Sequence, residues 1–107
     1  MAMFLIQTSI PDFQHAQQLA HQLLVQKLAA CVHIAPQGQS LYYWQGKLEC
    51  QNEHLLTIKT SASARQACVD AIVERHPYDV PEIISLPIQE ADVSPAYLAW
   101  IIQQTEQ

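Results

Sequence analysis

Charged side chains are scarce in this sequence, where they supply 14% of the 107 residues. A globular domain usually has about a quarter of its residues charged. Hydrophobic residues, in contrast, make up half of the chain. A surface with so few charges suggests that part of it is covered, and a partner subunit is the simplest cover. We therefore expect an oligomer.

Basic residues are especially few: five Lys and Arg stand against ten Asp and Glu, and the net charge is −5. Since phosphate neutralisation supplies most nucleic-acid affinity, this balance argues against a nucleic-acid partner. No apolar run approaches the roughly 20 residues that span a bilayer, so no membrane segment is expected. The N-terminal "MAMFLIQTSIPD" lacks the positive n-region of a signal peptide, which makes the cytoplasm the expected location.

Cysteines are few and odd in number, at positions 31, 50 and 68, with no C-x-x-C spacing. This pattern argues for reduced thiols rather than a disulfide framework. A structural zinc site needs Cys or His clustered at short fixed spacings, which the sequence also lacks.

Hydrophobic periodicity predicts alternating strands and helices in one domain, residues 1–107. The expected elements are a strand over 3–9, a helix over 13–29 capped by Asp12, two long antiparallel strands within 31–61, a helix over 61–76, a strand over 81–89 and a helix over 94–104. The order βαββαβ, followed by a helix, is typical of a ferredoxin-like α+β fold in which both main helices pack on one face of the sheet.

The two central strands are too long for such a small domain. Arms of about 13–15 residues would reach some 45–50 Å, while a compact chain of this length has a diameter near 35 Å. The reversal between the arms falls near Gly46 or near Gln51-Asn52, and a bend is expected near Pro36. In "LYYWQ" both strand faces are apolar or aromatic, which again indicates a second chain.

Several motifs resemble the CutA divalent-cation-tolerance family. They are "KLAACVHIAP", "SLYYWQGKLE", "LLTIKT", "HPYDVPEIISLPI" and "YLAW", which occur in this order. The match as a whole extends from Thr8 to Trp100. The resemblance implies a ferredoxin-like subunit in a PII-like homotrimer whose long hairpins wrap neighbouring subunits. It also implies a cytoplasmic, non-enzymatic role in tolerance of divalent metals, copper above all, with no organic cofactor.

The sequence departs from that family at positions relevant to metal binding. In one branch, the proposed copper ligands are a cysteine before the Thr of the first strand and a His-His pair before "PY". The matching positions here are Gln7 and Arg75-His76, so one of three ligands is retained. His33 stands where many members have asparagine, two residues from Cys31 and on the same strand face.

Two residue pairs are candidate ligands for Cu(II) or another divalent cation. His76 and Glu82 flank a stretch stiffened by Pro77 and Pro81, which would fix both side chains. His76 as a simple helix C-cap is the structural alternative. Cys31 and His33 form a soft-ligand pair, although a buried Cys31 thiol is the more common outcome.

A second set of residues is a candidate for a ligand cleft between subunits: Lys59, Tyr43, Trp44 and Tyr78. Such a cleft, with His76 and Glu82 beside it, would bind a small anionic metabolite in a PII-like signalling module. Aromatic packing in the subunit interface is the alternative for Tyr43 and Trp44, and an ion pair with Glu82 is the alternative for Lys59. A third possible function is a protein-anchoring scaffold without a ligand.

Overall fold

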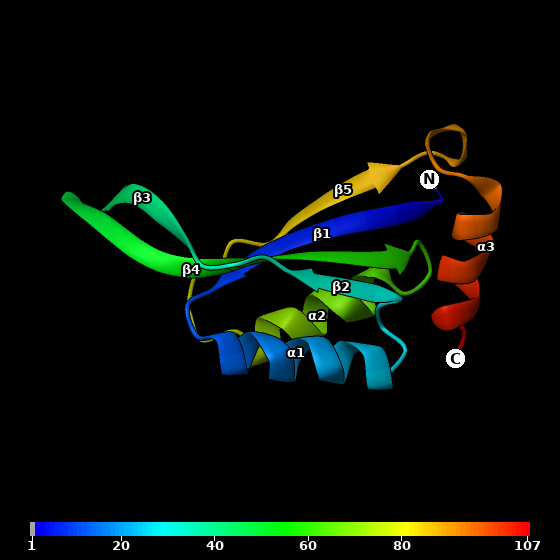
Figure 1. Cartoon of the computed structure of the whole chain (residues 1–107), viewed down its shortest axis with the longest axis horizontal. Coiled ribbons are helices and arrows are strands. Elements are labelled where there is room, and N and C mark those ends of the chain that lie inside the picture. Colours follow the sequence, from blue (N-terminus) through cyan, green and yellow to red (C-terminus); the bar gives the residue numbers. More distant parts are fainter. Residues whose placement is uncertain (1) are drawn as a thin grey trace.

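Residues 2–107 are described by a computed structural model, in which five strands form one antiparallel sheet (Figure 1). The strands are β1 (Met3–Ile10), β2 (Cys31–Ile34), β3 (Gly38–Trp44), β4 (Lys47–Ser61) and β5 (Ile84–Ile88), and the helices are α1 (Phe13–Val25), α2 (Arg65–Arg75), a 3-10 turn (Glu90–Asp92) and α3 (Pro95–Gln104). The sheet order is β2-β4-β1-β5, with β3 paired to the outer part of β4. The predicted ferredoxin-like α+β fold is confirmed.

The core lies between the sheet and the two helices α1 and α2, which cover the same face (Figure 1). Along β4 the side chains alternate as the sequence predicts: Leu56 and Ile58 are fully buried toward the helices. Thr57 and Lys59 lie on the opposite face, which α1 and α2 leave uncovered and which α3 covers only at one end. We call this opposite side the open face of the sheet.

The hairpin formed by β3 and β4 reverses at Gln45-Gly46, the first of the two predicted positions. Both residues have positive φ, 51° and 80°, and Trp44 pairs directly with Lys47. A two-residue loop with two positive φ values is the I′ turn favoured by twisted hairpins, and Gly46 adopts it without strain. The hairpin projects from the body (Figure 1), so the molecule extends over 45 × 27 × 23 Å.

Helix α1 ends four residues earlier than the predicted 13–29. Lys27 has a left-handed φ of 59°, and the Leu28 N–H donates to the Leu23 carbonyl at 2.9 Å, which closes the helix in a Schellman-like turn. Leu28 and Ala29 nevertheless pack against the core after the turn. Their burial explains why the apolar spacing continues beyond the helix.

Helix α2 also begins later than predicted, because Ser61 still belongs to β4 and pairs with Met3. The Ser61 hydroxyl accepts a hydrogen bond from the Ala64 N–H at 3.3 Å, so it satisfies one free donor of the first turn. The helix ends at Arg75 and His76 is extended with ψ 140°, as expected for a residue before proline.

Strand β5 is shorter than the predicted 81–89 and pairs with β1 only from Ile84 to Ile88. It is an edge strand, a position in which a sheet tolerates the missing N–H donor of Pro87. Helix α3 packs against one end of the sheet, where Leu98 and Ile101 contact Met3 and Ala30. Within residues 2–107, no helix has both the length and the hydrophobicity needed to cross a membrane.

Candidate functional site

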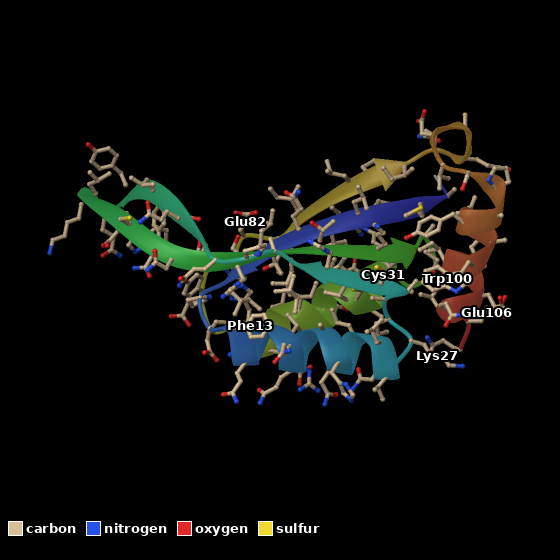
Figure 2. The ribbon with its side chains drawn as sticks, viewed as in Figure 1. Phe13, Lys27, Cys31, Glu82, Trp100 and Glu106 are labelled. Carbon is tan, nitrogen blue, oxygen red and sulfur yellow. The ribbon has the colours of Figure 1, made fainter. Side chains whose placement is uncertain are left out.

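A cleft of about 880 Å³ lies where the β3–β4 hairpin meets the segment between α2 and β5. It is lined by Ser9, Ser40, Leu41, Tyr42, Trp44, Glu49, Gln51, Glu53, Pro77, Tyr78, Asp79, Val80 and Glu82. Register places Ser40 opposite Gln51 and Tyr42 opposite Glu49, so one face of the hairpin forms one wall. Figure 2 shows Glu82 at the junction of hairpin and sheet, where the second wall begins.

Carboxylates dominate the chemistry of this cleft. Glu49 and Glu53 come from β4, while Asp79 and Glu82 come from the opposite wall, and the lining includes no Lys or Arg. Apart from the Trp44 indole N–H and the Gln51 amide, the polar side-chain groups of the lining are oxygens, which suit hard divalent cations. Within residues 2–107, no three His, Cys, Asp or Glu side chains lie close enough together to hold one ion.

Glu53 is the most buried of the four carboxylates, with 8% of its surface exposed. Its Oε2 accepts a hydrogen bond from the Tyr78 hydroxyl at 2.7 Å, a short bond of the charge-assisted kind. Burial raises the pKa of the Tyr78 phenol, and the bond to Glu53 and its negative charge raise it further. The phenol therefore stays protonated and donates a hydrogen bond to Glu53 over the physiological pH range.

His76 lies behind this pair as the C-cap of α2. Its Nε2 donates to the Ser9 carbonyl at 2.9 Å, and its Nδ1 accepts from the Tyr78 N–H at 3.1 Å. This pattern requires the neutral imidazole with the proton on Nε2. Burial lowers the pKa of His76 and nearby His15 lowers it further, while the bond to Ser9 and the charge of Glu53 oppose the shift.

The geometry of His76 bears on its predicted metal role. Both ring nitrogens are used within the protein, so coordination of a cation by His76 would require one of these bonds to break. Its predicted partner Glu82 is exposed and lines the cleft. Glu82 thus lies in the cleft, while His76 lies behind its wall and contacts the lining residue Tyr78.

Cys31 and His33 lie elsewhere, on β2 at the open face. Cys31 pairs with Lys59 and His33 pairs with Thr57, which confirms that the two side chains share a face. His33 is exposed and Cys31 is half-buried. Figure 2 shows Cys31 near α3, at the other end of the sheet from Glu82. The two residue pairs predicted to bind metal therefore lie in separate parts of the chain's structure.

The predicted ligand-cleft residues divide into two groups. Trp44 and Tyr78 line the cleft. Tyr43 projects from the other face of the hairpin and is 75% exposed, and the Lys59 ammonium lies 5.5 Å from the centre of the Tyr97 ring. A shared cleft between subunits stays a prediction for these four residues.

Sequence reasoning missed Glu49, Glu53 and Asp79. Asp79 lies inside the "HPYDVPE" motif, and the alternation of β4 puts Glu49, Gln51 and Glu53 on one face. These signals were available in the sequence. The meeting of that face with the 77–82 segment depends on a tertiary contact, which spacing alone does not predict.

The fold and the site together define a class: a ferredoxin-like α+β protein with a projecting hairpin and a carboxylate-lined cleft at its base. Residues 4–104 match the family described as CutA1 divalent ion tolerance protein. The chain therefore belongs to the CutA1 divalent ion tolerance family.

Individual relatives agree with this assignment. The chain is 46% identical over 91 residues to the divalent-cation tolerance protein CutA of Pectobacterium atrosepticum, covering 85% of this chain and 81% of that protein. The rice CutA1 crystal structure superposes with a TM-score of 0.92 at 36% identity, covering 100% of this chain and 96% of the other. That of Thermus thermophilus gives 0.90 at 36% identity, covering 97% and 99%.

Proposed function

We propose that this protein contributes to divalent-metal tolerance by binding a divalent cation reversibly in the carboxylate-lined cleft, without catalysing a reaction. The observation that carries the proposal is the lining: four carboxylates face the cleft and no cationic side chain accompanies them. A cation relieves the repulsion between such carboxylates, whereas an anionic metabolite increases it. The cleft therefore favours a metal ion over the anionic ligand of a signalling module.

Cation binding in one chain would use one or two of these carboxylates together with water. This follows because no three metal-binding side chains converge among residues 2–107. Such a site is weak and exchanges rapidly, which suits buffering of a metal excess. A non-enzymatic role is supported by His76, since both of its nitrogens are engaged and neither is free to act as a general base.

The protein works as a homotrimer in this proposal. Support comes from the outer face of the hairpin, where Leu41, Tyr43 and Leu48 are 64%, 75% and 63% exposed. Apolar patches of this kind on projecting hairpins mark interaction surfaces. A trimer built through the hairpin would place the cleft beside a neighbouring chain, which would then be in position to add ligands. The three free cysteines suit the reducing cytoplasm.

Calorimetric titration of metal-stripped protein with Cu(II) and with Mn(II) tests the cation proposal. We expect Asp79→Asn and Glu82→Gln each to weaken binding by about tenfold or more, because loss even of an outer partner typically costs 10–100-fold. Glu74→Gln, which removes an exposed carboxylate on α2, is the matched control and should bind as the parent does.

Two results would count against the assignment. If binding is lost only in Cys31→Ser and His33→Ala, the metal binds at β2 and the cleft is not the site. If neither metal produces heat with the parent protein, the proposed cation binding is wrong and the scaffold function gains support.

A further inference from the structure

Residues 77–82, which we call the strap, form the second wall of the cleft. Few hydrogen bonds hold the strap in place. Outside the helices and strands of residues 2–107, no backbone–backbone hydrogen bond involves the strap. Its Val80 side chain is 68% exposed. The two prolines stiffen the strap locally, but they supply no donor that could attach it to the sheet.

Among residues 2–107, Tyr78 makes the hydrogen bonds that attach the strap to the rest of the protein. Its N–H donates to His76 Nδ1 at 3.1 Å, next to the strap, and its hydroxyl donates to Glu53 Oε2 at 2.7 Å, across the cleft. The rings of Tyr78 and His76 are also in contact, with centroids 5.2 Å apart. The bond to Glu53 therefore joins the strap to β4.

This bond also joins the two halves of the carboxylate set, because Asp79 and Glu82 lie on the strap while Glu49 and Glu53 lie on β4. We propose that Tyr78 is a positioning residue: its hydroxyl pins the strap against the hairpin and orients the Glu53 carboxylate toward the cleft. The attachment of the strap by Tyr78 is inferred from geometry alone. The orientation of Glu53 as a cation ligand rests on the proposed function.

A phenol suits this task for two reasons. It donates a hydrogen bond to Glu53 without bringing a positive charge, so the carboxylate keeps its negative charge for a cation. Hydrogen bonds from neighbouring groups orient metal-binding carboxylates and raise affinity. His76 supports the arrangement from behind, since its bond to the Ser9 carbonyl fixes the ring against which Tyr78 packs.

Tyr78→Phe tests the pin, because it removes the hydroxyl and retains the ring. We expect the NMR order parameters of Asp79, Val80 and Glu82 to fall from the rigid range, about 0.85, toward the flexible range below about 0.6. Tyr97→Phe is the matched control, since Tyr97 lies on α3 outside the cleft and its hydroxyl makes no hydrogen bond to residues 2–107. Unchanged order parameters in Tyr78→Phe, or equal loss in Tyr97→Phe, would overturn the pin.

Glu53→Gln separates the pin from cation binding. The amide oxygen still accepts the Tyr78 hydrogen bond, so the strap should remain ordered, whereas Mn(II) affinity should fall by about tenfold or more. Tyr78→Phe should lower Mn(II) affinity by about tenfold and Tyr97→Phe should not. A loosened strap with undiminished affinity would overturn the positioning role. If the parent binds no Mn(II) or Cu(II), the proposed function fails, and the order parameters still decide whether Tyr78 pins the strap.

Discussion

Strand β4 passes through two regions of the molecule, and its apolar side chains are buried in one region and exposed in the other. In its inner part, Leu56 and Ile58 are fully buried beneath α1 and α2. In its outer part, Leu48 is 63% exposed, and its cross-strand neighbour Tyr43 is 75% exposed. One strand thus carries apolar side chains both inside the domain and well beyond it. The body is thus stabilised within one chain, whereas the exposed hairpin is the part that the proposed trimer would cover.

The largest expected effect is the loss of a core side chain from the body. Ile58→Ala should lower the free energy of unfolding by about 2–5 kcal/mol, since it leaves a cavity beneath the helices. Denaturant titration measures this loss, which should be the same at all protein concentrations. Leu48→Ala is the comparison variant, and its cost should depend on concentration because it acts through assembly. An equal, concentration-independent cost at both positions would contradict the contrast between the two regions.

The next effect concerns assembly through the hairpin. Tyr43→Glu places a charge in the exposed apolar patch and should shift the mass measured by light scattering from about three times 12.1 kDa toward one chain. Gln17→Glu, which adds a charge at an exposed position of α1, outside the hairpin, should leave the mass unchanged. A parent protein of 12.1 kDa at micromolar concentration would refute the oligomer itself.

A smaller effect is expected at the tip of the hairpin. Gly46→Ala should destabilise the turn by about 1–2 kcal/mol, because φ of 80° is unfavourable for a residue with a Cβ. No atom lies within 4 Å of the added methyl group, so the cost comes from the backbone alone. Hydrogen exchange of the hairpin amides measures it, and Gly46→Asn should cost less, since asparagine tolerates left-handed conformations. Equal exchange in both variants and the parent would show that the turn geometry is unimportant.

The smallest effect is a pH dependence at the junction of the two regions. The pKa of His76 is lowered from its ordinary 6.5, mainly by burial. The unfolded chain therefore takes up this proton at a higher pH than the folded protein does. The contribution of neutral His76 is complete above about pH 6.5 and is lost as the pH falls below that value.

Thermal unfolding between about pH 7.5 and 5.5 checks this expectation. The parent should lose more stability over that interval than His76→Gln, which cannot titrate. His21→Gln removes an exposed histidine on α1 and should behave as the parent does. Identical slopes for the parent and His76→Gln would show that His76 does not titrate differently on folding.

The fold could be predicted because its main signals are local. The apolar spacing of α1 and the alternation at Leu56 and Ile58 each specify an element and the face it buries. The ends of elements were harder to place, since the left-handed Lys27 stops α1 while the buried residues after it continue the helical spacing. The position of the reversal remained open in the sequence because Gln45-Gly46 is a weaker turn signal than Asn-Gly.

Only the wall of the cleft formed by the proline-containing segment could be predicted from the sequence. Prolines 77 and 81 mark His76 and Glu82, but the carboxylate that accepts the Tyr78 hydrogen bond is Glu53, which lies 25 residues earlier in the chain. A polar residue on a hairpin face is typical of a solvated surface, so nothing local distinguishes Glu53. Its burial arises from the packing of the strap, a consequence of tertiary structure.

The proposal that the cleft binds a divalent cation is tested most directly by Mn(II) in an NMR titration. A paramagnetic ion broadens the amide signals nearest to it, so it reports the place of binding as well as its occurrence. We predict that substoichiometric Mn(II) broadens the signals of residues 49–53 and 77–83 first and leaves those of Cys31–Ile34 sharp. Selective broadening at Cys31–Ile34, or uniform weak broadening throughout the protein, would contradict a cation site in the cleft.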